Sequence, residues 1–224
     1  MKFTRIFSFM VLAGLATGAQ ATNGYFSHGY GMKAKGMAGA STTNTEDAFG
    51  GANNPASMAF AGNRFDLGVD LFSPKRSASR SGSVGLDGSM DSDSDYFLIP
   101  EIGYNKMIGS NLSLGVTVYG NGGMNTNYPG DQLAAGFCGP GAPSSNAFCG
   151  QGRLGVDLMQ LIVAPTVAFK VAPNHSIGIS PLLGYQRFKA EGLQAFSGFS
   201  SSPANLTNRG YDDAYGYGVR LGYL

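Results

Sequence analysis

The chain contains 224 residues, of which 35 are glycine and none is tryptophan; only 13% are charged, and the net charge is +1. So much glycine argues against a helical globular domain, because each glycine costs a helix roughly 1 kcal/mol relative to alanine. The lysine and arginine residues are scattered and create no basic field, which argues against nucleic-acid binding.

The first 21 residues have the pattern of a secretory signal peptide. Lys2 and Arg5 give a positively charged start, residues 6–15 are apolar, and small residues stand at positions 19 and 21. The apolar stretch is too short to cross about 30 Å of hydrocarbon as a helix. We therefore predict export, with cleavage between Ala21 and Thr22.

Residues 22–63 are predicted to form a separate segment without regular strands. The segment is rich in glycine and alanine and shows neither strand alternation nor a sustained helical period. Pro55 fixes its own φ and favours an extended Asn54, so a rigid turn is expected up to Ala56. We interpret the segment as a plug, or hatch, inside a barrel formed by residues 64–224. Alternatively, the turn only reverses the chain before the first strand.

Later stretches alternate apolar and polar side chains, as β-strands do because successive side chains point to opposite faces. The predicted strands are residues 65–72, 96–104, 112–119, 159–171, 177–185 and 215–223. Their apolar faces, and the tyrosines near their ends, are typical of strands that cross an outer membrane. Asp66 and Asp70, on the second face of the first strand, predict that this face is wet.

The connections between the predicted strands differ in length. Short ones at 105–111 and 172–176 alternate with long polar ones at 73–95, 121–155 and 189–214. This is the asymmetry of periplasmic turns and extracellular loops, so we predict an all-β fold: a transmembrane antiparallel β-barrel rather than a soluble β-sandwich.

Six strands are too few to close a barrel, since about eight is the smallest number known. An open edge in lipid would leave backbone groups unpaired. We therefore expect the chain to be the N-terminal portion of a longer protein. A short form that closes its barrel by oligomerising is the alternative.

Two features of the predicted strands indicate a hydrophobic channel whose wall is interrupted at one place. Phe97 and Ile99 are expected to point into the lumen, where apolar side chains would contact hydrophobic cargo. Gly120, Gly122 and Gly123 follow the third predicted strand, and glycine in a strand marks a bulge or bend. Such a bend would open the wall sideways; alternatively, the strand ends there in a glycine-rich turn.

Cys138 and Cys149 are the only cysteines, and they lie in a loop rich in glycine, proline and serine. In an exported chain they are predicted to form a disulfide that shapes this loop. A metal site would need histidine or further cysteine nearby, which the sequence does not place there. The chain also lacks a nucleophile elbow and a dinucleotide motif, so we predict no catalytic residue, metal or cofactor.

The predicted hatch carries three sequence motifs: TNGYF at 22–26, GMAGAS at 36–41 and EDAFGGANNPA at 46–56, before a strand that opens at Arg64. In these motifs the chain resembles the long-chain fatty acid transporters of the Gram-negative outer membrane, the FadL/TodX type. The resemblance implies a fourteen-stranded barrel with an N-terminal hatch in its lumen, of which this chain supplies about the first six strands.

In that family, hydrophobic substrate enters a groove of extracellular loops, passes to a pocket beside the hatch and leaves through a gap at a kinked third strand. By resemblance, Asn54, Pro55 and Ala56 would lie at the inner pocket, and Phe26 near the moving end of the hatch. Gly120, Gly122 and Gly123 would form the kink, and residues 121–155 would carry the outer groove.

The resemblance predicts passive transport of hydrophobic molecules, either long-chain fatty acids or hydrocarbons, across the outer membrane, and no enzymatic activity. The expected partners are a hydrophobic small molecule and the lipid and lipopolysaccharide of the membrane, with the full-length protein a monomer. The alternatives are a general porin or adhesin-type barrel with a structural plug and, further removed, an outer-membrane lipid hydrolase.

Overall fold

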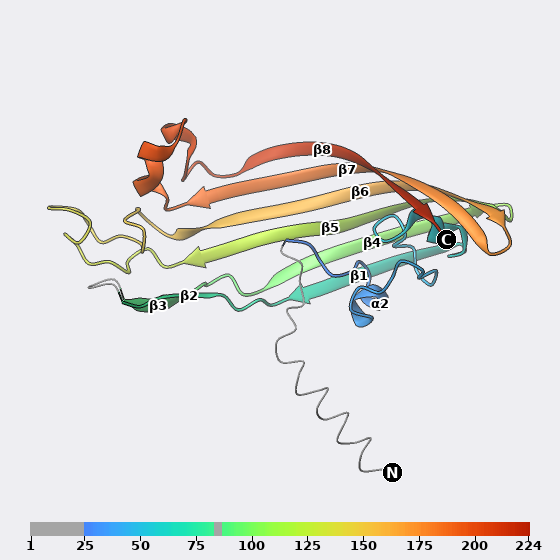
Figure 1. Cartoon of the computed structure of the whole chain (residues 1–224), viewed down its shortest axis with the longest axis horizontal. Helices are drawn as coiled ribbons and strands as arrows, with labels where there is room; N and C mark the ends of the chain where they lie inside the picture. Colours follow the sequence, from blue (N-terminus) through green and yellow to red (C-terminus); the bar gives the residue numbers. More distant parts are fainter. Residues whose placement is uncertain (1–24, 83–86) are drawn as a thin grey trace, which may run out of the picture.

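The computed structural model describes residues 25–82 and 87–224, so the predicted signal peptide and its cleavage site lie outside the described residues. One antiparallel sheet of six strands, called the wall below, makes up most of the fold (Figure 1). Its strands, each paired with the next in this order, are β1 (Arg64–Phe72), β4 (Phe97–Ile108), β5 (Leu112–Tyr128), β6 (Leu154–Ala172), β7 (His175–Glu191) and β8 (Asp212–Tyr223). The predicted all-β, antiparallel architecture is confirmed.

Several strands are longer than the apolar alternation predicts. β4 continues to Ile108, so the predicted turn at 105–111 shrinks to residues 109–111. β5 runs through the glycine cluster to Tyr128, so a strand end at Gly120 is wrong. A register shift between Gly120 and Gly122 explains this miss, because an extra residue interrupts the period-two pattern in the middle of the strand.

The long connections lie at one end of the wall and the short turns at the other (Figure 1). Residues 73–96 contain a small separate hairpin, β2 (Ser77–Arg80) and β3 (Gly88–Asp91), which the sequence did not predict. The β7–β8 connection contains two 3-10 turns, η3 (Gln194–Phe199) and η4 (Pro203–Asn205). The β5–β6 connection, residues 129–153, has no regular strand or helix.

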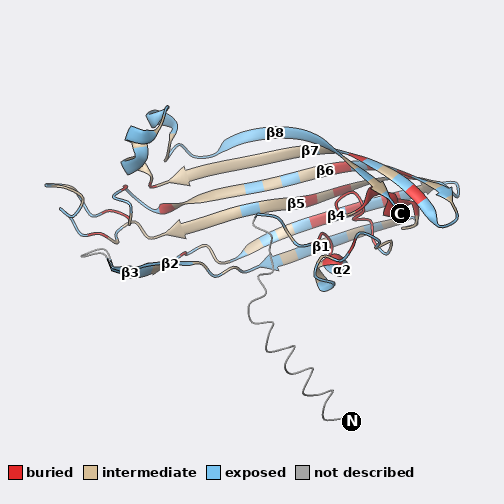
Figure 2. Ribbon diagram, in the orientation of Figure 1, coloured by how far each residue is buried: buried red, intermediate tan, exposed pale blue. Residues whose placement is uncertain are grey.

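Exposed residues recur along the strands of the wall (Figure 2), and the large ones are mostly apolar and share one face. On β1 the exposed side chains are Phe65, Leu67, Val69 and Leu71, whereas the residues between them are partly covered. Such a face is unfavourable in water and favourable against lipid tails, as on the outside of a membrane barrel. No helix in the described part of the chain is long and apolar enough to cross a bilayer.

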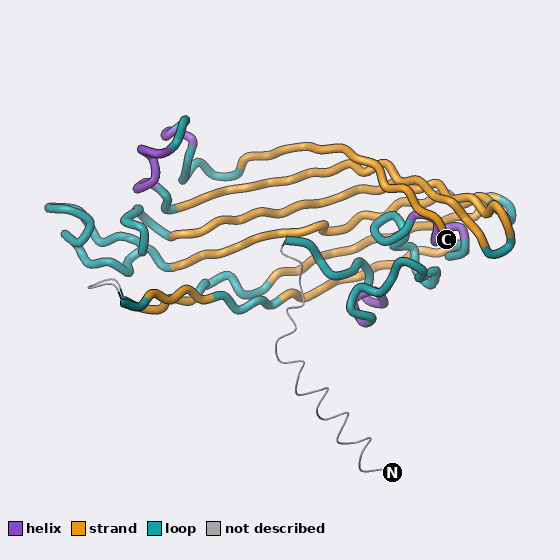
Figure 3. Tube along the Cα trace, viewed as in Figure 1, coloured by secondary structure: helices purple, strands orange, loops and turns teal. Residues whose placement is uncertain are grey.

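Residues 25–63, called the hatch below, pack against the other face of the wall. Apart from two short turns, α2 (Met32–Gly36) and η2 (Pro55–Ala59), this segment is irregular (Figure 3). Small side chains bring the two layers together: Ala48, Met58 and Ala59 of the hatch form a buried cluster with Ala168 of β6.

Glycine allows this contact to be made between backbones. A Cβ atom on Gly103 of β4 would lie 2.6 Å from the carbonyl oxygen of Ala48, closer than real Cβ atoms come. Close packing between the hatch and the wall therefore requires glycine at this position, whereas many other described glycines lie in open space.

Candidate functional site

The C-terminal part of the hatch, residues 47–62, is fastened to the wall by side chains that donate hydrogen bonds to its backbone carbonyls. These side chains are Asn105 of β4, Thr117 of β5, Ser176 of β7 and Arg220 of β8. Asn105 alone donates to the carbonyls of Met58 at 2.9 Å and Gly62 at 2.8 Å. A buried carbonyl without a partner costs about 1–3 kcal/mol, so this set of donors fixes where the segment lies.

Asn54, Pro55 and Ala56 are buried in this contact between hatch and wall. Asn54 is extended (φ −140°, ψ 112°), as Pro55 predicts, and its Oδ1 accepts from the Ala56 N–H at 3.1 Å to cap η2. Its Nδ2 donates to the carbonyls of Thr42 at 2.9 Å and Tyr223 at 3.0 Å. The structure gives the tripeptide an anchoring role, and its contact with substrate stays a prediction.

The pairing of β4 with β5 stops part-way along the two strands. The ladder ends at the Glu101–Tyr119 pair, although β4 reaches back to Phe97 and β5 continues to Tyr128. On its other edge β5 stays paired with β6 as far as Tyr128, through the bulge at Gly120 and Gly122. The wall therefore contains an unpaired stretch, called the gap below, between residues 97–100 and 120–124.

The first described residues of the hatch lie against the gap. The Gly123 N–H donates to the Tyr25 carbonyl at 3.1 Å, and Phe26 forms an antiparallel bridge with Gly122. A Cβ on Gly122 would lie 2.3 Å from the Tyr25 oxygen, so glycine is required for this approach. Across the gap, a Cβ on Gly120 would lie 2.7 Å from Cγ2 of Ile99.

An ion cluster that is buried at Glu101 and partly exposed at Lys35 and Asp70 holds the hatch at the edge of the gap. Lys35 Nζ lies 2.9 Å from Asp70 Oδ2 on β1 and 3.0 Å from Glu101 Oε1 on β4. The other Glu101 oxygen accepts from the Gly31 N–H at 2.8 Å, and the Glu101 side chain is 1% exposed. Burial alone would lower the pKa of Lys35, but its hydrogen-bonded carboxylates outweigh burial and raise that pKa.

The two acidic residues on which the prediction of a wet inner face on β1 rests are partly exposed, and both are paired. Asp70 pairs with Lys35 of the hatch, and Asp66 accepts from the Ala48 N–H at 2.8 Å. Asp66 also accepts from Arg64, two residues earlier on β1, at 2.6 and 2.7 Å. Alternation shows that both carboxylates point inward, but it cannot show that a segment distant in the sequence supplies partners for them.

Tyr30 joins the hatch to a row of amide side chains on the wall. Its hydroxyl donates to Asn121 Oδ1 at 3.0 Å, and Asn121 Nδ2 donates to Gln160 Oε1 at 3.2 Å. Gln160 Nε2 in turn donates to Gln186 Oε1 at 2.6 Å. The row crosses β5, β6 and β7 beside the gap.

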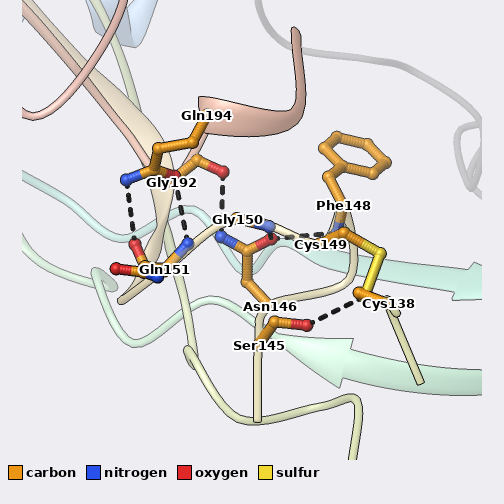
Figure 4. Close-up of a disulfide and its surroundings, with 9 residues drawn as sticks. All are labelled: Cys138, Ser145, Asn146, Phe148, Cys149, Gly150, Gln151, Gly192 and Gln194. Atoms are coloured by element: carbon orange, nitrogen blue, oxygen red, sulfur yellow. Dashed lines mark hydrogen bonds between the residues drawn. A yellow bond between two sulfur atoms is a disulfide. The ribbon is translucent and has the colours of Figure 1, made fainter. Parts of the chain in front are cut away.

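At the long-connection end, Cys138 and Cys149 form a disulfide with an S–S distance of 2.08 Å (Figure 4). Asn146, between them, donates from Nδ2 to the Gly192 carbonyl at 2.9 Å, which ties the β5–β6 loop to the β7–β8 loop. The rings of Phe148 and Phe196 meet edge-to-face with their centroids 5.6 Å apart. The disulfide thus stabilises a partly exposed aromatic contact between the two loops.

Removing this disulfide should loosen the outer loops without affecting the wall. We expect Cys138→Ser combined with Cys149→Ser to cost at most about 3 kcal/mol of loop stability, the value for closing a short loop. Limited proteolysis of the folded protein should then cut within 129–153 faster than in the parent, while heat-modifiable gel migration stays the same. Equal cleavage rates would show that the Asn146 bonds alone hold the loop.

Within residues 25–82 and 87–224, no group of three or more His, Cys, Asp and Glu side chains is placed to hold a metal ion. The candidate site thus consists of the gap, the hatch residues bonded beside it, and the row of amide side chains.

The family model described as outer membrane protein transport protein (OMPP1/FadL/TodX) matches residues 10–214. The chain belongs to this family. The resemblance noted in the hatch motifs is thereby confirmed, and the family is one of outer-membrane β-barrel transport proteins.

Solved structures share the fold at low sequence identity. The toluene transporter TodX of Pseudomonas putida is 18% identical over 88% of this chain and 52% of its own, with a TM-score of 0.66. A second structure of that transporter, also 18% identical, covers 82% of this chain and 50% of its own, with a TM-score of 0.57. The CymD monoaromatic hydrocarbon channel is 17% identical over 87% and 48%, with a TM-score of 0.54.

The chain spans about half the length of these solved structures. No curated protein sequence matches it significantly. The similarity to solved structures shows the fold alone. Together with the family, it identifies the six strands as part of an outer-membrane β-barrel.

The structure brings some of the predicted site residues together and separates others. Phe26, Ile99 and the glycines of the bulge meet at the gap. Phe97 lies on the same face of β4 as Ile99, and its ring is 5.3 Å from the guanidinium carbon of Arg76. The tripeptide of η2 anchors the hatch elsewhere on the wall, and the disulfide lies in the outer loops.

Sequence reasoning missed Lys35, Glu101 and Tyr30, which connect the hatch to the edge of the gap. The signal for Glu101 was present, since it is an acidic residue on an otherwise apolar inner face. Nothing local distinguishes Lys35 from the exposed Lys33 two residues earlier.

Proposed function

We propose that the whole protein carries hydrophobic molecules, long-chain fatty acids or hydrocarbons, passively across the outer membrane. Cargo enters between the aromatic side chains of the outer loops and leaves sideways through the gap. The observation that carries this proposal is the contact of Tyr25 and Phe26 with Gly122 and Gly123, which places the N-terminal end of the hatch over the gap.

The chemistry of the gap supports an apolar cargo. Unpaired backbone groups are costly in lipid, so a gap in a membrane wall is tolerated only where something covers it. Residues 25–26 cover it from the hatch side, and Phe97 and Ile99 line it. Two of the solved structures that share the fold are a toluene transporter and a monoaromatic hydrocarbon channel, which supports the same class of cargo.

A general porin with an inert plug is supported less well. An aqueous pore needs an open path through the lumen, whereas residues 47–62 are fastened by side chains from β4, β5, β7 and β8. The hatch also has two unlike parts. Residues 47–62 are bonded to four strands of the wall. Residues 25–45 contact the wall chiefly through the Lys35 cluster, Tyr30 and Tyr25, and are otherwise bonded to the hatch itself by Asn53 and Asn54, which suits a part that withdraws.

We also propose that the hatch comprises residues 22–63 of a mature chain cleaved after Ala21, and that the whole protein acts as a monomer. Its exposed apolar face would contact membrane lipid, and its outer end lipopolysaccharide.

A reversible cross-link across the gap tests the proposal. We expect Ile99→Cys with Gly120→Cys, once oxidised, to lower cellular uptake of a radiolabelled monoaromatic or fatty acid by about tenfold or more, while detergent-solubilised protein still binds it. Reduction should restore uptake. The order of magnitude follows if release through the gap is the main exit, because each 1.4 kcal/mol added to a barrier slows a step tenfold.

The control cross-links the same two strands where they are paired, between the gap and the turn that joins them. Lys106 and Leu114 face each other in the β4–β5 ladder, so Lys106→Cys with Leu114→Cys cross-links strands that are already paired. Its uptake should match the parent under both redox conditions. Undiminished uptake by a fully cross-linked gap variant would rule out sideways release there.

A further inference from the structure

The amide row on β5, β6 and β7 has a direction and an open end. Each member donates to the next, from the Tyr30 hydroxyl to Asn121, from Asn121 to Gln160, and from Gln160 to Gln186. The Nε2 group of Gln186 ends the row without a hydrogen-bond partner among residues 25–82 and 87–224. The row therefore presents a free N–H donor at its far end.

The bulge creates the first wall position of this row. Tyr119 pairs with Ile162 and Gly122 with Gln160, and Asn121 is the additional residue between these pairs. The extra residue turns its amide towards the hatch, where it meets both Tyr30 and Gln160. The feature that interrupts the wall thus also supplies a polar group beside the gap.

Apolar side chains lie next to the row on the same face. Ile162, two residues from Gln160, and Leu182, four residues from Gln186, pack against the buried cluster that contains Tyr30 and Tyr119. A ligand in this position would have an apolar wall along its body and a line of amides at one end. Ligand sites commonly combine a mostly apolar lining with a few placed polar groups.

We propose that Gln186, held by Gln160 and Asn121, binds an uncharged oxygen of the hydrophobic cargo, such as a phenol hydroxyl or an aromatic ketone carbonyl. This inference rests on the transport function proposed above and names a preferred class within it. The free Nε2 group donates to the ligand oxygen, and its partners in the row fix the orientation of the amide.

The chemistry of the row suits a neutral oxygen better than a carboxylate. A buried carboxylate needs a cation or several donors to replace its water, whereas a hydroxyl or carbonyl is satisfied by one or two hydrogen bonds. The charged groups on the hatch face near the row are already paired. Lys35 faces Asp70 and Glu101, and Arg220 donates to the carbonyls of Gly51 and Ala52.

Binding of 1-naphthol and naphthalene to the whole protein in detergent tests the proposal, because the two probes share a ring system and differ by one hydroxyl. One hydrogen bond between uncharged groups corresponds to about a three- to tenfold difference in Kd. We expect the parent to bind 1-naphthol tighter by that factor, and Gln186→Leu to abolish the preference while binding naphthalene within about twofold of the parent. The parent should not bind 1-naphthoate, the carboxylate on the same ring system, more tightly than naphthalene.

Two controls keep the result interpretable. Gln151→Leu makes the same substitution on an exposed outer-loop side chain and should keep the preference. Gln186→Met, closer in shape to glutamine, repeats the test, and heat-modifiable migration shows whether each variant is folded. An equal loss of both probes in folded Gln186 variants, or no preference in the parent, overturns the subsite alone. Failure of the parent to bind either probe overturns the proposed transport function as well.

Discussion

Replacing Gly178 with alanine should displace η2 from the wall and make the outer membrane permeable to hydrophilic solutes. The added Cβ would lie 2.4 Å from the carbonyl carbon of Pro55 and 2.5 Å from the backbone nitrogen of Ala56. Both atoms belong to the backbone of a buried turn, so no side-chain rotation relieves the overlap. Overpacking typically costs about 1–3 kcal/mol, and here that cost falls on the anchored part of the hatch.

Uptake of a large hydrophilic antibiotic by cells, and conductance in planar bilayers, would report the leak. The matched control is Gly184→Ala on the same strand and face, where the new Cβ would lie 3.3 Å from Cδ1 of Ile162. That atom ends a flexible side chain and can move by a few tenths of an ångström. If both variants leak equally, or if neither leaks, the close approach at Gly178 does not hold the hatch in place.

The sequence predicts the strands well and their ends poorly, for a physical reason. On β1, Phe65, Leu67, Val69 and Leu71 share one face, and period-two alternation is enough to identify both the strand and its lipid-facing side. Alternation fails wherever the backbone departs from a regular ladder. The extra residue in β5 does so, and the second half of that strand is therefore hidden from a pattern search.

The candidate site was predictable only where a residue type constrains the backbone. Glycines at 120, 122 and 123 indicate a bulge whatever their partners, and Pro55 fixes the conformation of Asn54. Which hatch residue meets which strand is a non-local question. Lys33 and Lys35 lie on the same five-residue helical turn, yet Lys35 is largely covered between two carboxylates and Lys33 pairs with Glu46 in solvent.

That difference makes Lys35→Met the sharpest test of how the hatch is held. We expect residues 25–45 to detach while the wall and residues 47–62 stay in place. Breaking a buried ion pair costs about 3–5 kcal/mol because the remaining charge is left without a partner. Since the Asp70 side chain is 30% exposed, we expect the lower end of that range. The other bonds of residues 25–45, from Tyr30 and Tyr25 to the wall and from Asn53 and Asn54 to Tyr30 and Thr42, contribute about 1 kcal/mol each, so the segment should detach more often without staying detached.

Hydrogen–deuterium exchange of the whole protein should show faster exchange in 25–45 than in the parent, with 47–62 unaltered. Lys33→Met is the control, since the exposed pair with Glu46 contributes at most about 1 kcal/mol. Adding Glu101→Gln to Lys35→Met should restore part of the protection, because the amide is neutral and its oxygen still accepts from the Gly31 N–H. Faster exchange in both parts of the hatch, with no recovery in the double variant, would mean that Lys35 stabilises the whole fold rather than one releasable segment.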